Sequence, residues 1–346
     1  MSDVLRLAVD ARDLASDTRG IGRYARAILP RIAQRDDIEL TLLVYAPLFR
    51  ARRSQLSEAL GTDGFRLATR AFGCDVMWHP GNGSFFLPSA ANVVTIHDAG
   101  PFRFPQENPR KRRHQQEPFF RSARQAQRVI AVSNFGRAEV LDVLGIEPAR
   151  IDVIYHGVDD IFTEGDPRPA QAMVERPYFI FVGDPIAEPR KNFSTLFDAY
   201  IAAFPDDQTR PLLVVLRPVR PALPGVRYVG PPAGSGPDDV HLRDLYRGAL
   251  ALCMPSYYEG FGMPLLEAMA CGTPVISSDI SSLPEIGGGA ALYASPYDAR
   301  AWSDVLQRVA GDEVLRSRLR GEGLEHVKAF SWERSAQRHA EIFHSL

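Results

Sequence analysis

Cysteine is scarce in this sequence. Only Cys74, Cys253 and Cys271 occur among its 346 residues, and no two of them form a Cys-x-x-Cys pair. This spacing fits neither a disulfide framework nor a thiolate zinc site, and it is typical of proteins of a reducing compartment.

Long apolar runs and a strong net charge are also missing. No stretch approaches the ~20 apolar residues needed to span a bilayer, and the N-terminal MSDVLRLAVDAR is too charged for a signal peptide. A formal net charge of -2 argues against a surface tuned as a whole to nucleic acid. The sequence therefore predicts a cytoplasmic protein without a nucleic-acid partner, which at most rests on the inner face of a membrane.

What is present is a regular alternation of two kinds of segment. Short runs rich in Val, Ile, Leu and Phe alternate with amphipathic stretches, which is typical of parallel sheets covered by helices. The alternation stops once, at residues 163–177 (TEGDPRPAQAMVERP), where proline and charge indicate an interdomain linker. Because the chain exceeds the usual size of a single core, we predict an α/β protein of two doubly wound, Rossmann-like parallel-sheet domains facing a cleft.

The expected domains are residues 1–165 and 176–328, and a last helix within 329–346 is expected to pack back on the first domain. Strands are expected at 5–9, 38–45, 76–79, 93–97, 129–133 and 151–155, then at 178–182, 212–216, 226–229, 249–254, 275–278 and 290–293. Helices are expected at 22–34, 110–128, 134–144, 192–204, 241–247, 264–270, 298–310, 313–330 and 332–343.

Residues 251–278 (ALCMPSYYEGFGMPLLEAMACGTPVISS) have the pattern strand, glycine loop, helix, turn, strand. Pro264 suits the first turn of a helix, and Gly272 suits the left-handed position just after one. Gly260 and Gly262 let backbone N–H groups approach a ligand, and the helix N-terminus behind them favours an anion.

Two carboxylates flank this glycine loop. Glu259 precedes the expected helix, and Glu267 is expected within its first turn. Acids at an anion-seeking helix end are explained if they accept hydrogen bonds from hydroxyls, such as those of a sugar and a ribose. Taken singly, each is more simply a solvated loop acid or a favourable first-turn acid. Together with the glycines between them they predict a nucleotide-sugar site.

A second candidate segment is GDPIAEPRKNF, residues 183–193, after the first strand of the second domain. Arg190 and Lys191 are expected to open the next helix, where cations are unfavourable against the helix dipole. Cations in that position suggest a bound polyanion, at the carboxyl ends of parallel strands where such ligands bind. A solvated Arg-Lys pair is the simpler alternative.

These motifs, with VVTIHD, TRGIGRYAR, AVSNFGRAEV, YHGVD and SSLPEIGGGAALY, resemble retaining glycosyltransferase family 4 over nearly the whole chain. The resemblance is to the GT-B type with two Rossmann-like domains, and within it to mannosyltransferases of bacterial surface polysaccharide assembly. It implies a hexosyltransferase that uses a GDP- or UDP-linked donor and no further cofactor.

The resemblance also implies a role for each matching residue. Lys191 with Arg190 would hold the donor diphosphate, and Glu259 would contact the hydroxyls of the donor sugar. Glu267 would bind the ribose, and His97 would lie beside the transferred sugar. The remaining donor-binding positions would be Gly20, Gly22, Gly260, Phe261, Gly262, Met263 and Pro264.

Two positions depart from the family pattern. Asp184 stands where some members carry a phosphate-binding arginine, which puts the number of phosphate-binding cations in doubt. RPVRPALPG, residues 217–225, replaces a glycine-rich turn, which puts the shape of the base pocket in doubt.

Several apparent signals carry less weight. Gly20 to Ala25 match the dinucleotide fingerprint G-x-G-x-x-A, but ten residues separate them from the preceding strand and no acid ends the next one, so we reject a nicotinamide site. His97, at a strand end, could equally be structural when judged by itself. No Asp-x-Asp pair forms a metal clamp, so Lys191, Arg190 and the helix end would replace a metal at the leaving diphosphate.

The segment between Arg110 and Arg128 is basic and is interleaved with Phe119 and Phe120. It is either a solvated helix with a core face or a patch for anionic lipid or a lipid-linked diphosphate acceptor.

The leading prediction is transfer of a hexose to a glycan or lipid-linked acceptor, and the resemblance implies that the hexose is mannose from GDP-mannose. The alternatives are a nucleotide-sugar epimerase or hydrolase on the same scaffold, and a non-catalytic nucleotide-sugar or glycan-binding subunit. Product analysis with and without an acceptor separates the first alternative, because an epimerase needs none.

Overall fold

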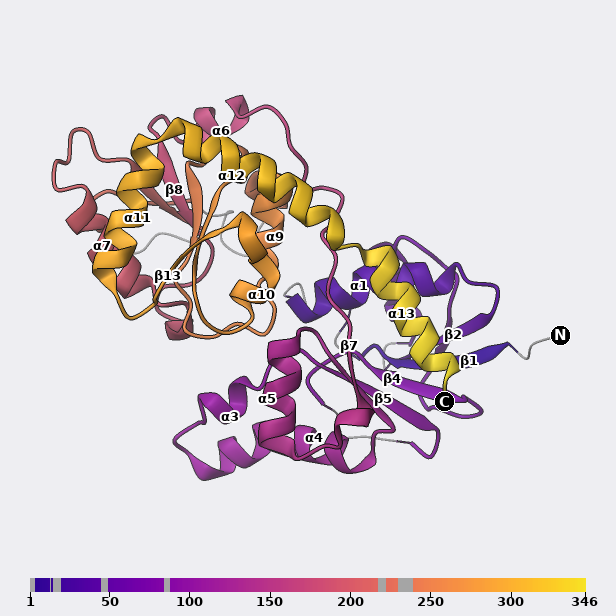
Figure 1. Ribbon diagram of the computed structural model, residues 1–346. Helices are drawn as coiled ribbons and strands as arrows, with labels where there is room; N and C mark the ends of the chain where they lie inside the picture. Colours follow the sequence, from indigo (N-terminus) through magenta and orange to yellow (C-terminus); the bar gives the residue numbers. More distant parts are fainter. Residues whose placement is uncertain are drawn as a thin grey trace. The chain divides into compact units, whose positions relative to one another are not determined.

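The computed structural model describes residues 4–12, 14, 20–44, 49–83, 88–216, 222–229 and 239–346. The chain forms two compact units (Figure 1). Unit 1 comprises Met1–Gly157 with Phe330–Leu346, and unit 2 comprises Val158–Ala329. The division falls after Gly157, before the position 165 expected from the sequence. Within the expected linker lies a short helix, α6 (Arg168–Met173).

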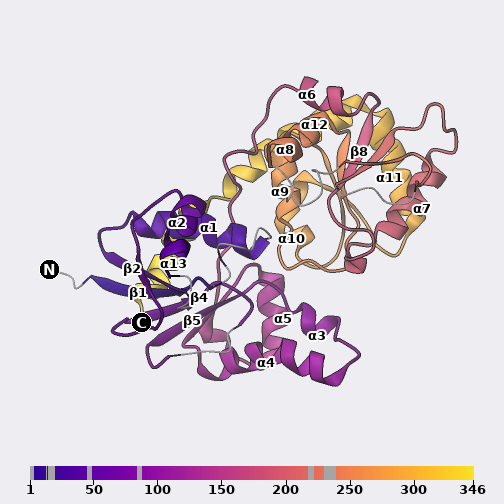
Figure 2. The ribbon, with the colours of Figure 1, turned by 180° about the vertical axis from the view of Figure 1, so that it is seen from behind.

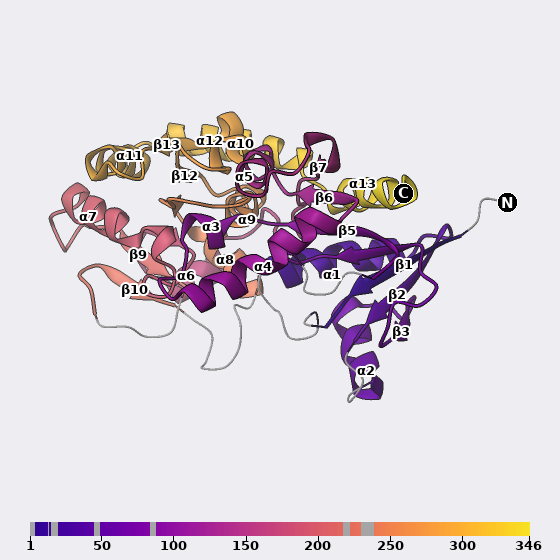
Figure 3. The same cartoon turned by 90° about the horizontal axis from the view of Figure 1, so that it is seen from below.

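Unit 1 is built on a seven-stranded sheet in which all paired neighbours run parallel. The strand order is β3-β2-β1-β4-β5-β6-β7, which places β1, β2 and β3 side by side at one edge (Figure 3). Its first part has the order of a doubly wound nucleotide-binding fold. The strands are β1 (Leu5–Asp10), β2 (Ile38–Leu43), β3 (Arg66–Ala68), β4 (Val76–His79), β5 (Ala91–Ile96), β6 (Arg128–Ala131) and β7 (Ile151–Val153).

The helices of unit 1 are α1 (Gly20–Ala33), α2 (Phe49–Leu60), α3 (Gly100–Arg103), α4 (Pro109–Gln125), α5 (Asn134–Leu144), the 3-10 helix η2 (Pro148–Arg150) and α13 (Trp332–His344). Buried Phe119 of α4 and Val140 of α5 share a core with Val94 of β5. The burial of these apolar side chains is what holds the helices on this half of the sheet.

The last helix of the chain, α13, packs beside α1 in unit 1 (Figure 1). Arg31 Nε of α1 donates to Glu333 Oε1 at 2.7 Å, and Arg35 Nη1 donates to Gln337 Oε1 at 2.7 Å. Gly157, the glycine of YHGVD, lies against the backbone of Trp332, so that a side chain at this position would collide with it. The glycine therefore allows the start of α13 to approach closely.

Unit 2 is built on a six-stranded parallel sheet with the order β10-β9-β8-β11-β12-β13. The strands are β8 (Tyr178–Phe181), β9 (Leu212–Val215), β10 (Val226–Tyr228), β11 (Ala251–Met254), β12 (Val275–Ser278) and β13 (Leu292–Ala294). The helices besides α6 are η3 (Pro189–Lys191), α7 (Phe193–Ala203), α8 (Asp239–Gly248), α9 (Met263–Ala270), α10 (Leu283–Gly287), η4 (Gly288–Ala290), α11 (Ala299–Gly311), α12 (Glu313–His326) and η5 (Val327–Ala329).

Helices cover both faces of this sheet. Phe179 of β8 shares a core with Tyr200 of α7 and Trp302 of α11, all fully buried. Helices α8 and α9 lie against the other face, on the opposite side of the sheet from α7 and α11 in Figure 2. The prediction of two doubly wound α/β units with all-parallel sheets is therefore confirmed. Among the described residues, no helix is both long and apolar enough to cross a bilayer.

Candidate functional site

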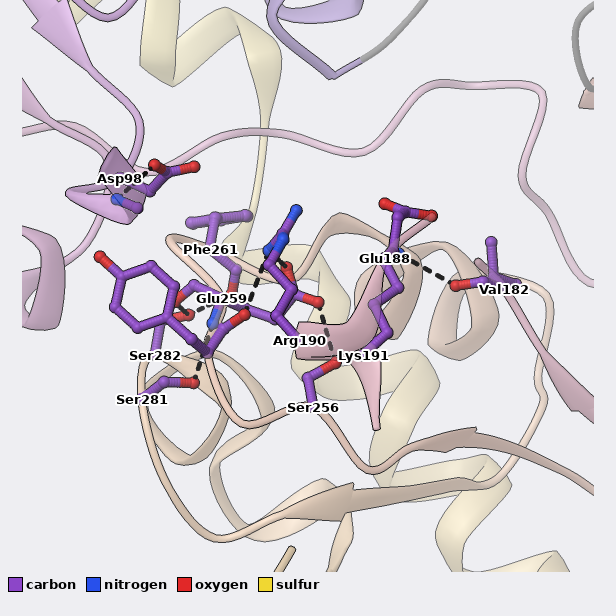
Figure 4. A network of polar contacts seen from close by, with 12 residues as sticks. Asp98, Val182, Glu188, Arg190, Lys191, Ser256, Glu259, Phe261, Ser281 and Ser282 are labelled. Carbon is purple, nitrogen blue, oxygen red and sulfur yellow. Dashed lines mark hydrogen bonds and ion pairs between the residues drawn. The ribbon is translucent and has the colours of Figure 1, made fainter. Parts of the chain in front are cut away.

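The candidate residues of unit 2 lie in loops that follow β8 and β11. These two strands are paired neighbours in the sheet, so the segments after Phe181 and Met254 leave the same edge. Ligands of open parallel sheets bind at this carboxyl edge. The fold therefore brings Arg190, Lys191 and Glu259 together from distant parts of the sequence (Figure 4).

Arg190 and Glu259 form an ion pair, with 3.1 Å between Nη1 and Oε2. The same nitrogen donates to the carbonyl oxygen of Tyr258 at 3.1 Å, and Ser256 Oγ donates to Glu259 Oε1 at 2.9 Å. The Arg190 side chain is 35 % exposed and that of Glu259 12 %. A guanidinium that is oriented by a carboxylate yet partly accessible is suited to bind an anion.

Two serines hold the loop that carries Glu259 (Figure 4). The backbone N–H of Glu259 donates to Ser281 Oγ at 3.3 Å. Ser282 Oγ, which is fully buried, lies 2.9 Å from the carbonyl oxygen of Glu259 and 2.8 Å from that of Phe261. Ser281 and Ser282 are thus positioning residues that the sequence argument missed, although they open the recognised SSLPEIGGG segment.

Lys191 lies beside this network. Its Nζ donates to the carbonyl oxygen of Val182 at 3.0 Å. A side chain at Gly183 would collide with the aliphatic stem of Lys191, so the glycine leaves room for the lysine. Lys191 therefore reaches the end of β8 because the residue after Val182 has no side chain.

The expectation that Arg190 and Lys191 open a helix was wrong. Both end the 3-10 turn η3, and α7 begins only at Phe193, because Asn192 adopts a left-handed conformation with φ of 55° that interrupts the helix. Neither residue lies in the first turn of α7, so the helix dipole gives no reason to expect an anion beside them. The case for a polyanion now depends on the convergence of the two cations at the carboxyl edge.

Asn192 ties three loops of this edge together. Its side chain is 1 % exposed, and Nδ2 donates to the carbonyl oxygens of Pro255 at 3.0 Å and Pro296 at 2.8 Å. These carbonyls follow β11 and β13. Asparagine suits the position because it tolerates the left-handed conformation and also supplies two donors.

We expect Asn192→Ala to lower the free energy of unfolding by about 2–4 kcal/mol, from two lost hydrogen bonds and a left-handed alanine. Chemical denaturation measures this. Asn192→Gly is the matched variant, because it relieves the backbone strain but also loses both bonds. Wild-type stability in Asn192→Ala would contradict the assigned role.

The glycine loop leads directly into α9. Gly262 has φ of +106°, a conformation that strongly favours glycine, and it is the residue before Met263, where the helix begins. Pro264 stands in the first turn, and Gly272 has φ of +74° just beyond the helix end, as the sequence predicts. The positive end of α9 therefore follows the loop of Gly260, Phe261 and Gly262.

Glu267 is not in the first turn of α9, as the sequence led us to expect. The helix starts at Met263, which places Glu267 one turn further along. The residue is 3 % exposed, and the hydroxyl of Tyr246 lies 3.4 Å from its Oε2. A carboxylate this deeply buried needs hydrogen-bond donors to offset the cost of desolvation.

Asp184, one of the two departures from the family pattern, has a local structural role. Its Oδ1 accepts hydrogen bonds from the backbone N–H groups of Ile186 and Ala187, both at 2.9 Å. Its own N–H donates to Glu188 Oε2 at 2.8 Å. Asp184 therefore closes the turn after β8. The other departure, at 217–225, lies largely outside the described residues, which omit 217–221.

The remaining candidates belong to unit 1. His97 follows β5 and is 9 % exposed; its Nε2 lies 2.7 Å from the carbonyl oxygen of Pro80, and its backbone N–H donates to Asn82 at 2.6 Å. Nε2 therefore carries the proton of the neutral ring, since a carbonyl can only accept. Gly20 and Gly22 form the start of α1, where Gly20 is exposed and Gly22 buried.

His97 is part of a buried aromatic and histidine cluster. The ring of Tyr24 meets that of His97 edge to face at 4.8 Å, and the Tyr24 hydroxyl lies 2.5 Å from His339 Nε2. Burial is the main cause that lowers the pKa of His339 to about 4 and the pKa of His156 well below its ordinary value. At Asp10, burial opposes ionisation, but the hydrogen bond from Arg12 and the nearby ring of His79, 3.7 Å away, outweigh it and lower its pKa.

These histidines make stability depend on pH. Because their pKa values are lower in the folded state, unfolding takes up protons below the unfolded pKa of about 6.5. We expect the free energy of unfolding to keep its full contribution from these histidines above that pH. As the pH falls toward 4, the free energy of unfolding should decrease by up to about 1.4 kcal/mol per pH unit for each histidine. Urea denaturation between pH 7 and pH 4.5 measures the slope.

Two variants test whether this pH dependence of stability comes from the buried His339. In His339→Gln the slope should be shallower, whereas in the matched variant His344→Gln, which changes a partly exposed histidine of the same helix, it should stay as in the wild type. Equal slopes in His339→Gln and the wild type would contradict the account.

The basic segment forms much of α4. Arg110 and Lys111 are exposed in its first turn, where cations are unfavourable against the helix dipole. Arg124 pairs with Glu117, and Arg103 before the helix pairs with Glu139. Phe104 and Phe120 are 48 % and 37 % exposed. The segment therefore joins exposed cations to accessible aromatic rings.

Among the described residues, no group of three or more His, Cys, Asp or Glu side chains is placed to hold a metal ion.

Two family models match the chain, one in each half. "Glycosyltransferase Family 4" matches residues 28–162, and "Glycosyl transferases group 1" matches residues 234–326. The second range contains Glu259, the glycine loop and Glu267.

Similar proteins are found among sequences and among solved structures. The O-antigen chain mannosyltransferase B of Escherichia coli is 29 % identical over 365 residues, which cover 91 % of this chain and 93 % of that protein. A sucrose-phosphate synthase from Thermosynechococcus elongatus superposes with a TM-score of 0.74 at 20 % identity, over 99 % of this chain and 98 % of that one. The Anabaena protein HepE, in complex with UDP and glucose, superposes with a TM-score of 0.72 at 16 % identity, over 99 % of this chain and 100 % of that one.

Proposed function

We propose that unit 2 binds a nucleoside diphosphate sugar and that the hexose of this donor is transferred to a glycan or lipid-linked glycan acceptor. The chain belongs to glycosyltransferase family 4. The observation that carries the proposal is the Arg190–Glu259 ion pair with Lys191 beside it at the carboxyl edge of the sheet. It joins the cations that a diphosphate needs to a carboxylate that can accept from sugar hydroxyls.

Charge development explains why these groups would accelerate transfer. As the bond from sugar to phosphate breaks, negative charge grows on the departing diphosphate, and preorganised cations and N–H groups stabilise it. Arg190 is already oriented by Glu259, so little reorganisation is needed. Each charge-assisted contact contributes about 1.5–3 kcal/mol. We propose that Lys191, Arg190 and the amides after Gly260 do this without a metal ion and with retention of configuration.

The donor is proposed to be GDP-mannose. The support is the match with a mannosyltransferase over most of both chains, whereas HepE shows that a protein of similar fold holds UDP and glucose. A thermal-shift series with UDP-, GDP-, ADP- and dTDP-sugars tests this choice. A donor at 100 times its dissociation constant adds about 2.7 kcal/mol of stability. We expect the largest shift with GDP-mannose, and no shift with any donor would contradict the proposal.

The exposed start of α4 is proposed to bind an anionic membrane surface near a lipid-linked acceptor. Each basic residue near such a surface contributes about 1 kcal/mol, so Arg110→Glu with Lys111→Glu should weaken binding to anionic vesicles at least about 30-fold at low salt. Vesicle pelleting measures this. Arg300→Glu with Arg308→Glu, an equal change of charge at exposed positions of α11, is the matched control. No binding by the wild-type chain would refute the membrane proposal.

A further inference from the structure

Two stacked tyrosines stand at the carboxyl edge of the unit 2 sheet, outside the network described above. The rings of Tyr257 and Tyr297 lie 5.1 Å apart between centroids, with 27° between their planes. Tyr257 follows β11, two residues before Glu259, and Tyr297 follows β13. Tyr297 is 74 % exposed, whereas most aromatic side chains of this unit are buried in its core.

The pair is held by the same contacts that build the donor edge. The backbone N–H of Tyr257 donates to the carbonyl oxygen of Arg190 at 2.8 Å. Asn192 binds the carbonyl oxygens of Pro255 and Pro296, which precede the two tyrosines. The loop that carries Tyr297 is also held from α11, where Trp302 Nε1 donates to the carbonyl oxygen of Ser295 at 3.1 Å. Both backbones are therefore fixed, and a ligand pays little entropy to order them.

We propose that the Tyr257–Tyr297 pair is a stacking platform for a sugar ring of the acceptor glycan. The C–H face of a pyranose is apolar and flat enough to lie on an aromatic ring, while its hydroxyls at the rim stay in water. Tyrosine suits such a ligand, since it presents a large rigid face and a polar tip. This inference rests on the proposed function, because it takes the acceptor to be a glycan.

A nucleobase of the donor also stacks on aromatic rings, but the position favours the acceptor. In the proposed donor pose the ribose lies at Glu267, which contacts Tyr246 of α8, and the sugar lies at Glu259. The tyrosine pair is joined to Arg190 and to the β13 loop, at the sugar end of this series. A ring on the platform is therefore next to the transferred hexose, and the base lies at the opposite end.

The test compares Tyr297→Ala with Tyr297→Trp, which keeps an aromatic face. Phe72→Ala, which removes an 83 % exposed ring from unit 1, is the matched control. With GDP-mannose as donor and a panel of mannose, glucose, galactose and rhamnose trisaccharides as acceptors, we expect Tyr297→Ala to raise the acceptor KM about tenfold, with kcat within about twofold. Tyr297→Trp and Phe72→Ala should keep the wild-type KM.

Binding is read separately from transfer. Saturation-transfer NMR should show contact between the wild-type chain and at least one trisaccharide, and Tyr297→Ala should lose it, whether or not transfer occurs. Thermal shifts with GDP should be equal in both chains. Failure of all transfer with retained trisaccharide contact would refute the proposed function but not the platform. Four results would overturn the platform. The first two are an unchanged acceptor KM in Tyr297→Ala and equal NMR contacts in both chains. The others are no contact between the wild-type chain and any trisaccharide, and a thermal shift with GDP that Tyr297→Ala loses.

Discussion

Replacing Lys191 with alanine is expected to lower kcat about 10²–10³-fold, the cost of removing one preorganised donor from a developing anion. The fold should survive, because the wild-type side chain makes one hydrogen bond, from Nζ to the carbonyl of Val182. Losing it costs about 1 kcal/mol. Steady-state release of the nucleoside diphosphate measures kcat, and a thermal melt of the same sample measures stability.

Two further variants separate charge from packing. Lys191→Met keeps an unbranched stem beside Gly183 and removes only the ammonium group, so its kcat should fall as far as that of Lys191→Ala. Lys328→Ala removes an exposed lysine of unit 2 that pairs with Glu325 and should be as active as the wild type. Near wild-type turnover in Lys191→Met would show that the charge has no part in catalysis.

Replacing Glu259, in the glycine loop, and replacing Glu267, in α9, should have different effects on donor binding and transfer. Glu267→Gln is expected to raise the dissociation constant of GDP itself about 10–100-fold, because the proposed charged acceptor for the ribose is lost. Glu259→Gln should leave GDP affinity within about threefold and lower kcat/KM for the sugar donor about 10²-fold. Arg190 stays placed in that variant by its hydrogen bond to the carbonyl oxygen of Tyr258.

Isothermal titration with GDP and donor kinetics on the same preparations distinguish the two effects. Glu322→Gln, an exposed change on α12, is the matched control. Equal loss of GDP affinity in Glu259→Gln and Glu267→Gln would contradict the division of roles between sugar and ribose.

Much of the fold was predictable because buried parallel strands have continuous apolar sequences. β8, with the sequence YFIF, and β11, with ALCM, are buried at every residue. The edge strand β3 (RLA) has no fully buried residue, so its sequence carries no such signal. Helix α2 (FRARRSQLSEAL) was missed because it is dominated by polar residues and has no clear apolar stripe.

The local geometry around the candidate site residues was predictable only in part. The glycines and prolines gave the start and end of α9, because these residues have strong conformational preferences. The pairing of Arg190 with Glu259 joins segments 69 residues apart, and nothing in either segment encodes it. Likewise the left-handed Asn192, which moves Arg190 and Lys191 off the helix, depends on two proline carbonyls supplied by other loops.

The central claim is that this chain transfers a hexose from a nucleoside diphosphate to a glycan. The most direct measurement is mass spectrometry of the acceptor panel after incubation with each of the four nucleotide sugars, together with proton NMR, which reads the anomeric configuration of the product and any epimerisation of the donor. The account predicts that one acceptor gains a single hexose from GDP-mannose, with one GDP released per hexose and with the product showing the same anomeric configuration as the donor. An unmodified acceptor with every donor, or an epimerised donor formed without any acceptor, would contradict it.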